Sequence, residues 1–363
     1  MRKKLLILGL DSLVPPMLKQ LVADGRLPNF ARLFQDGYYT DVIPTFPPWT
    51  PPGWATIGTG AWPSTHGIEG FTLHFPGEPL DLEHPPFNSH LCQAEYLWEA
   101  AVQQGKRAIV IKYPGTWPPR ASGVVQIGGA GGYARDINPN DISHPACYTT
   151  RDDVPESIRV ELQPATTWEN MPASHLPPLE TVFVVTPCQP GRPTLYRGLV
   201  YADAATVYDR LLIAQRKNGR HPLAILEAGQ WSAWVTDRFT LHDGEEAGTF
   251  RWKLLELAPD GSSLHLFMTQ NHPTHGYTQP AELAQELNEH VGPFCENISI
   301  RHRLRQWVDD ATLLELWDEH TRWLERTLRY TAKSMPWDIL CTQWHPLDFV
   351  FHGYSSGIDP EHP

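Results

Sequence analysis

The chain has 363 residues, 41% of them hydrophobic, and a formal net charge of −12 at pH 7. This length suits one large α/β domain or two smaller ones, and the composition is that of a soluble globular protein. The acidic balance disfavours non-specific binding to nucleic acid and offers no basic platform to an anionic membrane.

The N-terminus imitates a signal peptide, because Met1-Arg-Lys-Lys precedes an apolar run at residues 5–10. That run ends at Asp11, and no small-residue cleavage site follows, so we expect a cytoplasmic protein. No stretch of the sequence reaches transmembrane length. The cysteines are far apart and never in CxxC spacing, which favours free, mostly buried thiols. They are Cys92, Cys147, Cys188, Cys295 and Cys341.

The first part of the chain alternates between strand and helix patterns. The expected elements are a buried parallel strand at 4–10, helices at 16–23 and 29–34, a strand at 38–43, a helix at 93–104 and a strand at 107–113. Glycines at Gly25 and Gly37 follow the first two helices and mark their ends. This alternation predicts an α/β fold with a mostly parallel sheet flanked by helices.

The middle of the chain has β-strand patterns separated by proline-rich coil. The expected strands are at 123–127, 181–185, 195–201, 232–241, 250–257 and 264–269. Asp260-Gly261 lies between the last two and predicts a hairpin turn. The glycine-rich run at 128–132 lacks the Lys-Ser/Thr ending of a phosphate-binding loop and indicates a flexible turn. We interpret this region as a β-rich insertion or cap.

Helix patterns return after the β-rich region. We expect helices at 281–291 and 311–333, the second with an apolar stripe at Leu313, Trp317, Leu324 and Leu328. A strand at 337–344 then leads into His345-Pro-Leu-Asp348-Phe-Val-Phe-His352. The predicted organisation is therefore an N-terminal part of the α/β core at 1–125, the insertion at 126–275, and a return to the core at 276–363 that ends before the core is complete.

Two polar groups near the N-terminus indicate a site for an anion. Asp11 follows the first strand, and open α/β folds bind ligands at the carboxyl ends of their strands. Thr50 precedes Pro51-Pro52, a helix start in which Thr50 would be the N-cap. A hydroxyl at a helix N-terminus facing a carboxylate suits phosphate, especially with a metal ion between them. Each residue alone also has a structural interpretation, Asp11 as a turn residue and Thr50 as a plain N-cap.

Asp348 and His352 are four residues apart just after a strand. On a helix both side chains would share one face, and this oxygen and nitrogen pair suits Zn²⁺ or Mn²⁺. A solvated pair is the alternative, because a chain with 17 histidines contains such spacings by chance. His345 could be a substrate contact or a loop histidine, and His66, in Ser64-Thr65-His66-Gly67-Ile68, could be a hydrogen-bonded turn residue.

Taken together, these motifs resemble those of the type I phosphodiesterase/nucleotide pyrophosphatase family, within the alkaline phosphatase superfamily. The matching elements are the strand ending in Asp11, Leu27-Pro-Asn-Phe-Ala-Arg-Leu33 followed by Gly37, Pro44-Thr45, Thr50-Pro-Pro-Gly-Trp, Thr59-Gly60, His66-Gly-Ile68 and the strand that runs into Asp348-x-x-x-His352. The β-rich region fits this family only loosely.

The resemblance implies an alkaline-phosphatase-like core and a metal-dependent hydrolase of phosphate esters. Thr50 would be the nucleophile, transiently phosphorylated, and would contact one metal ion together with Asp11. Asp348 and His352 would bind a second ion. Both ions would be divalent, zinc or alternatively manganese, and the substrate would be a small phosphate ester or a nucleotide-like molecule. Because a threonine hydroxyl is a poor nucleophile at neutral pH, such a cation would be needed to activate it.

The sequence departs from the family at two points. Phe71 occupies the position of an asparagine that steadies a phosphoryl oxygen, which weakens a pyrophosphatase assignment more than ester hydrolysis. The family also has a further Asp-His pair and a final histidine after the second motif, whereas this chain ends at Pro363. We therefore expect either a C-terminally truncated fragment, which we favour, or a degenerate member, and impaired activity in the chain as given.

Other functions remain open at this stage. A metal-dependent phosphomutase would exchange phosphate without releasing it, and a non-catalytic binding protein would keep the fold without the metals. A sulfatase is disfavoured, because no C/S-x-P-x-R run surrounds Thr50.

Overall fold

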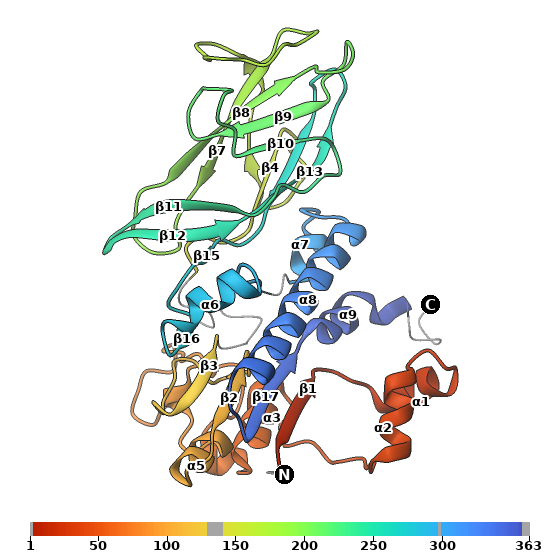
Figure 1. Ribbon diagram of the computed structural model, residues 1–363, viewed down its shortest axis with the longest axis vertical. Coiled ribbons are helices and arrows are strands. Elements are labelled where there is room, and N and C mark those ends of the chain that lie inside the picture. The colour runs from red at the N-terminus through yellow and green to blue at the C-terminus, as the bar shows by residue number, and fades with distance from the viewer. Residues whose placement is uncertain (1–2, 129–140, 297–298, 358–363) are drawn as a thin grey trace. The chain divides into compact units, whose positions relative to one another are not determined.

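The computed structural model describes residues 3–128, 141–296 and 299–357, which form two compact units (Figure 1). The first, here the sheet unit, contains residues 1–139, 278–280 and 328–363. The second, here the β-rich unit, contains residues 140–277 and 281–327.

A five-stranded, mostly parallel sheet organises the sheet unit. Its order is β1 (Leu5–Leu10), β17 (Ile339–Trp344), β2 (Ala108–Ile111), β3 (Val124–Ile127) and β16 (Thr278–Gln279). The first four strands are parallel, and β16 is antiparallel to β3. The predicted mixed α/β fold with a mostly parallel sheet flanked by helices is confirmed.

Two helices cover one face of this sheet with aromatic side chains. Trp54 of α3 (Thr50–Thr59) and Trp98 of α5 (Leu97–Gln103) are buried in one cluster with Val110 and Cys341 from β2 and β17. Tyr113 contacts both tryptophan rings edge-on, at centroid distances of 5.4 and 5.1 Å. This packing fixes α3 against the sheet, and Trp54 reaches Asp11 at the carboxyl end of β1, where the candidate site lies.

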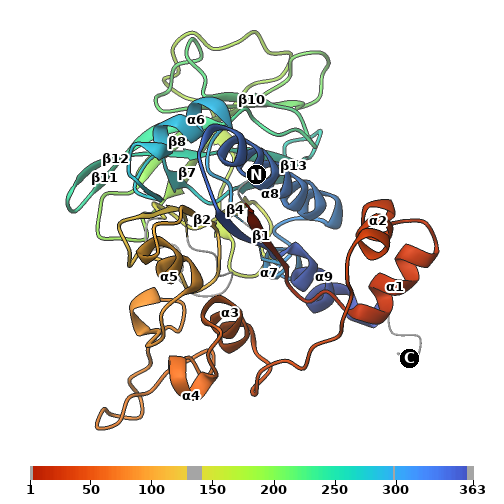
Figure 2. The same cartoon turned by 60° about the horizontal axis from the view of Figure 1, so that its bottom comes forward.

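The prediction that residues 4–10 form a buried strand is right about the strand and wrong about its burial. Leu5, Leu6 and Leu8 of β1 are about half exposed, because β1 pairs on one side only, with β17, at the end of the described sheet. The helices α1 (Pro15–Ala23) and α2 (Pro28–Asp36) lie beside each other and apart from β1 in both views (Figures 1 and 2).

The strand predicted at 38–43 is also wrong. These residues are coil, and Tyr38, Val42 and Ile43 are each more than 80% exposed. Their apolar and β-branched composition has a strand pattern, but none of the described strands pairs with them to supply the ladder of hydrogen bonds that a strand needs.

The β-rich unit contains three described sheets. One has the order β10 (Ala224–Leu226), β9 (Arg210–Ala214), β8 (Thr194–Tyr201), β7 (Leu179–Val185), β6 (Gln163–Pro164). Another has β11 (Val235–Leu241), β12 (Gly244–Phe250), β15 (His272–Pro273). The third has β13 (Trp252–Leu257), β14 (Leu264–Met268), β4 (Ala146–Thr149), β5 (Ile158–Arg159). The predicted hairpin is confirmed, with Gly261 at φ +76°. Of the glycine-rich run only Gly128 lies within the described residues.

Helices α6 (Leu283–His290) and α8 (Asp310–Ser334) lie close to the predicted ranges 281–291 and 311–333. The other helices are α9 (Pro346–Tyr354), which holds the Asp348–His352 motif, and the elements that the sequence analysis did not predict, α4 (Pro63–His66), α7 (Arg301–Leu304), η1 (Ser89–Leu91) and η2 (Ser355–Gly357). The five cysteines form no disulfide bonds within the described part of the chain, and Cys188 is the exposed one. In the part of the chain that the structure describes, no helix combines the length and the apolar character needed to cross a membrane.

A charged pair ties together the starts of two central strands. The backbone N–H and the guanidinium of Arg107, just before β2, donate to both carboxylate oxygens of Asp338 at 3.0–3.1 Å. Asp338, just before β17, is buried. The pair therefore sets the register of β17 against β2 at the end of the sheet opposite to the candidate site.

We predict that Asp338→Ala lowers the midpoint of denaturant-induced unfolding, because it leaves a buried backbone N–H and a guanidinium without their acceptor. Asp318→Ala is the control, since it removes an exposed i,i+4 pair with Arg322 on α8 and should change the midpoint little. Equal midpoints for the two variants would contradict this role.

Candidate active site

Asp11 lies at the carboxyl end of β1, and three donors converge on one of its oxygens. Its Oδ2 accepts hydrogen bonds from His345 Nδ1 at 2.8 Å, Gln343 Nε2 at 3.2 Å and Trp54 Nε1 at 3.4 Å. Its other oxygen, Oδ1, makes no hydrogen bond within the described part of the chain. The carboxylate is thus fixed through Oδ2, which leaves Oδ1 as the oxygen able to bind a cation.

Asp348 is fixed in a comparable way at the start of α9. Ser12, directly after Asp11, donates its hydroxyl to Asp348 Oδ1 at 2.6 Å. Ser12 has φ +55°, a left-handed conformation that costs a serine about 1 kcal/mol. Asp348 Oδ2 faces His352 Nε2 at 3.4 Å and His345 Nε2 at 3.5 Å. As predicted, Asp348 and His352 share one face of a helix.

His345 connects the two carboxylates. It is buried, and its two ring nitrogens face Asp11 and Asp348 respectively. The sequence left a substrate contact or a loop histidine open for His345, and its burial between two carboxylates was not predicted. His352, in contrast, is about 59% exposed on its side chain.

The donor types fit a divalent cation such as Zn²⁺ or Mn²⁺, because they are carboxylate oxygens and imidazole nitrogens. Their arrangement is a row of pairwise contacts, from Asp11 through His345 and Asp348 to His352. Among the described residues, no group of three or more His, Cys, Asp or Glu side chains is placed to hold a metal ion. Metal binding would therefore require these side chains to exchange contacts with one another for contacts with the ion.

Thr50 is the first residue of α3 rather than its N-cap, which corrects the sequence prediction by one position. Trp49 is the N-cap, and it makes no side-chain capping bond. The Thr50 hydroxyl, which is partly buried, makes no hydrogen bond to any described residue. Trp54, one turn later on the same helix face, donates to Asp11, so the face that carries Thr50 is the one turned toward Asp11.

Gly9 allows this approach of α3 to β1. A Cβ atom at Gly9 would lie 2.3 Å from Cη2 of Trp54. The absence of a side chain two residues before Asp11 thus lets the indole pack against the strand and reach the carboxylate.

His66 has a structural role beside α3. It is fully buried, its Nδ1 accepts from the backbone N–H of Ile68 at 3.0 Å, and its Nε2 lies 3.1 Å from Thr56 Oγ1. This pattern requires the neutral ring with its proton on Nε2. Burial lowers the pKa of His66 below its ordinary value, and Glu69 opposes this shift weakly.

Aromatic side chains lie next to Thr50. The rings of Trp49 and Phe71 are 6.3 Å apart, and both are about half exposed. Phe71 occupies the position where the resemblance leads one to expect an asparagine, so this side of the site presents an apolar surface.

Sequence reasoning missed Ser12 and Gln343. Ser12 follows Asp11 in the turn after β1, and Gln343 is a polar residue in an otherwise buried strand, opposite Gly9 in the parallel ladder. The signal for Gln343 was a polar side chain near the carboxyl end of a core strand. Ser12 gave no sequence signal.

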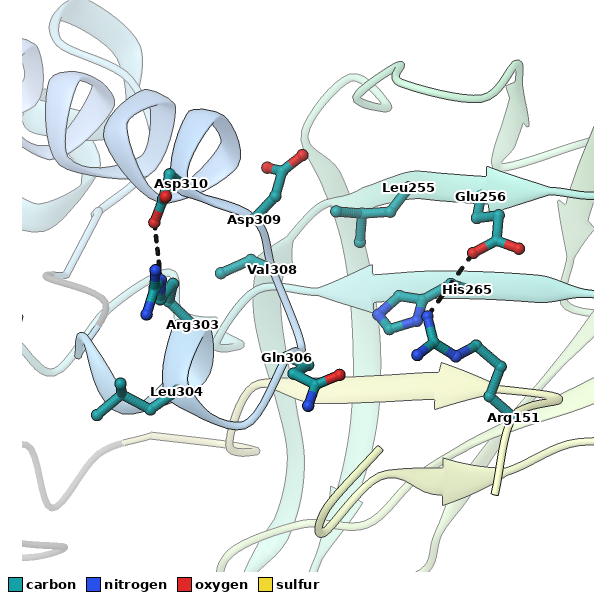
Figure 3. A pocket seen from close by; sticks show the side chains of 10 residues that line it. All are labelled: Arg151, Leu255, Glu256, His265, Arg303, Leu304, Gln306, Val308, Asp309 and Asp310. Carbon is teal, nitrogen blue, oxygen red and sulfur yellow. Dashed lines mark hydrogen bonds and ion pairs between the residues drawn. The ribbon is translucent and has the colours of Figure 1, made fainter. Parts of the chain in front are cut away.

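A polar recess of about 590 Å³ in the β-rich unit is the other candidate (Figure 3). Its charges already have partners, since Arg151 contacts Glu256 and Asp153, and Arg303 contacts Asp310. The recess therefore offers less to a charged ligand than the end of the parallel sheet.

The fold and this end of the sheet together define an α/β protein with a candidate site for phosphate ester chemistry. The model of the type I phosphodiesterase / nucleotide pyrophosphatase family matches residues 5–197, more than half of the chain, and the chain therefore belongs to this family. The family implies a phosphoric ester hydrolase that acts on small phosphate esters or nucleotides and is generally metal-dependent. The match includes Asp11 and Thr50, whereas Asp348 and His352 lie outside it. Searches of curated proteins and of solved structures found no match.

We predict that His66 makes the protein sensitive to acid. The unfolded chain, with an imidazole pKa of about 6.5, takes up a proton more readily than the folded protein. The stabilisation is therefore complete above about pH 6.5 and is lost as the pH falls toward the lower pKa of the folded state. Between about pH 7.5 and about pH 5.5, wild type should lose more free energy of unfolding than His66→Gln, as measured by urea denaturation. Identical losses of unfolding free energy in wild type and His66→Gln would contradict the role of His66 in acid sensitivity.

We predict that Gly9→Ala destabilises the protein by about 1–3 kcal/mol, because the new methyl group displaces the Trp54 indole from Asp11. Gly53→Ala on α3 is the matched control, since a Cβ there meets no atom within 4 Å. The control should leave stability unchanged or raise it by up to about 1 kcal/mol. Chemical denaturation measures both, and an equal effect of the two variants would disprove the close-approach argument.

Proposed function

We propose that this protein is a metal-dependent hydrolase of phosphate esters that acts through a phosphothreonine intermediate at Thr50. The observation that carries the proposal is the unused hydroxyl of Thr50 at the start of α3. An N-cap threonine would bond a backbone N–H of its own helix, and this one does not. Its helix face is also the one linked to Asp11 through Trp54.

The helix start is suited to a phosphoryl group. Pro51 and Pro52 carry no N–H, and the N–H of Gly53 donates to the carbonyl of Trp49. The N–H of Thr50 is therefore the donor left at this end of α3 for an incoming anion, and the helix dipole adds partial positive charge. The aromatic rings of Trp49 and Phe71 could contact an apolar ester group.

Asp11, Asp348 and His352 are the residues proposed to bind cations, Asp11 together with Thr50 and Asp348 together with His352. The exposed ring of His352 can turn outward, and Oδ1 of Asp11 is available to a cation. A bound divalent cation would lower the pKa of the Thr50 hydroxyl and offset the charge of the phosphoryl oxygens. The described ligands are fewer than two zinc ions normally require, so we propose weak metal binding and slow turnover.

In the proposed reaction the Thr50 hydroxyl gives its proton to solvent and its oxygen attacks phosphorus as the bond to the ester oxygen breaks, which transfers the phosphoryl group to Thr50 and releases the alcohol, protonated by solvent. Water then attacks the phosphorus of the phosphothreonine, which releases phosphate from a monoester or a phosphate monoester from a diester, and the Thr50 oxygen takes a proton to restore the hydroxyl. Asp11 and the N–H of Thr50 orient the reacting group, while the burial of Asp11 and His345 keeps that side of the site dry.

We predict that Thr50→Ala lowers the rate of bis(p-nitrophenyl) phosphate hydrolysis in the presence of Zn²⁺ or Mn²⁺ by at least about 10³-fold. The free energy of unfolding should change by less than about 0.5 kcal/mol, because the hydroxyl bonds no described residue. Mass spectrometry of the acid-quenched wild-type reaction should find a p-nitrophenyl phosphate group on Thr50.

Thr59→Ala is the control on the same helix, since its hydroxyl bonds only the carbonyl of Ala55 and the N–H of Ala61. It should keep the wild-type rate. Unchanged hydrolysis in Thr50→Ala would exclude the nucleophile, and no hydrolysis by wild type with any divalent metal would favour the non-catalytic binding protein. Transfer of phosphate between positions of a substrate without release would instead indicate a phosphomutase.

A further inference from the structure

His345 contacts both carboxylates of the candidate site, although neither the family resemblance nor the family match gives it a role. It lies at the N-cap position of α9, directly after β17, and is 4% exposed. Its position is where the ends of β1 and β17 and the start of α9 meet, so its ring touches groups from all three elements.

The ring orientation is fixed on several sides. Nδ1 lies 2.8 Å from Asp11 Oδ2, and the ring packs edge-on against Phe349 at a centroid distance of 4.5 Å and an interplanar angle of 88°. Gln343 Nε2 lies 3.1 Å from the same Nδ1 and 3.2 Å from Asp11 Oδ2. Because a carboxylate only accepts, the short contact assigns the proton to Nδ1, and the Gln343 amide then donates to Asp11.

This tautomer determines what each nitrogen can do. Nδ1–H holds Oδ2 of Asp11, which turns Oδ1 away from the imidazole. Nε2, unprotonated in this tautomer, lies 3.5 Å from Asp348 Oδ2, beyond hydrogen-bond distance, while Ser12 holds the other oxygen of Asp348. One imidazole thus bonds the first carboxylate and lies between it and the second, although the two come from opposite ends of the sequence.

We propose that His345 is a positioning residue that orients Asp11 for its cation through Nδ1–H and keeps its carboxylate apart from that of Asp348. This inference rests on the proposed function for the presence of a cation, and it concerns the protein side chains alone. Residues that orient metal ligands through hydrogen bonds typically change metal affinity by about 10–100-fold when they are replaced.

Three substitutions separate the contacts of His345. His345→Leu removes the hydrogen bond to Asp11 and the contact with Asp348. His345→Asn places an amide N–H near the position of Nδ1 and can still donate to Asp11. His345→Gln places its amide near the position of Nε2 and loses the bond to Asp11. The probe is Zn²⁺ alone, with its affinity measured by competition against a chromophoric chelator.

A second buried histidine–aspartate pair supplies the matched control. His272 is 2% exposed, and its Nδ1 lies 2.9 Å from Asp141 Oδ1 in the β-rich unit. His272→Leu therefore removes the same kind of buried contact away from the residues proposed to bind metal. It should lower stability and keep the Zn²⁺ affinity of wild type within about twofold.

We expect His345→Leu to weaken Zn²⁺ binding by about 10–100-fold, with His345→Gln close to it and His345→Asn within about fivefold of wild type. Should His345→Leu fail to fold by circular dichroism, the ratio between the Asn and Gln variants decides the question. Affinities within twofold of wild type for the folded variants, or equal losses for Asn and Gln, would overturn the proposal, as would wild type that binds no Zn²⁺.

The outcome for His345 and the outcome for the proposed function are separable. If wild type binds Zn²⁺ and His345→Leu weakens this binding, the positioning role stands even when no phosphate ester is hydrolysed, and only the proposed function fails. If esters are hydrolysed and every His345 variant keeps its Zn²⁺ affinity, the proposed function stands and the positioning role is wrong.

Discussion

The candidate site depends on the parallel pairing of β1 with β17. Their register places Gly9 opposite Gln343 and Leu10 opposite Trp344, and the N–H of Asp11 continues the ladder by donating to Trp344. This pairing brings residues from the two ends of the sequence to one edge of the sheet. A shift by one residue would turn Gln343 to the other face and separate it from Asp11, so the register of the backbone decides whether the site exists.

Two buried carboxylates near one imidazole are costly unless each is hydrogen-bonded. In the structure, one oxygen of each carboxylate accepts hydrogen bonds from protein donors, and the other oxygen accepts none from the described residues. Oδ2 of Asp11 and Oδ1 of Asp348 accept from protein donors, whereas Oδ1 of Asp11 accepts from no described residue and Oδ2 of Asp348 faces two imidazoles. Such an arrangement orients both carboxylates through one oxygen each, so that a cation could reach Oδ1 of Asp11 directly but would have to replace the imidazole contacts of Asp348 Oδ2.

The sequence allowed many of the helices and strands to be predicted, because hydrophobic periodicity and glycine stops are local signals, but not elements such as α4, β4 and β9. Prediction from the sequence failed where contacts between distant parts of the chain determine the local structure. Residues 38–43 have the composition of a strand and find no partner, and β1 has the composition of a buried strand and lies at the end of the described sheet. The joint contact of His345 with Asp11 and Asp348 was equally hidden, since it depends on a strand register that no spacing within the sequence encodes.

The start of α3 shows how a local rule can mislead about a functional residue. A threonine before two prolines follows the rule for an N-cap, yet the helix includes Thr50, and Trp49 precedes it without a capping bond. Because Pro51 and Pro52 have no N–H, little is left at this end for a threonine hydroxyl to cap. The prolines thus explain both why the helix begins here and why the hydroxyl is spared from capping it, which is the condition a nucleophile at a helix start requires.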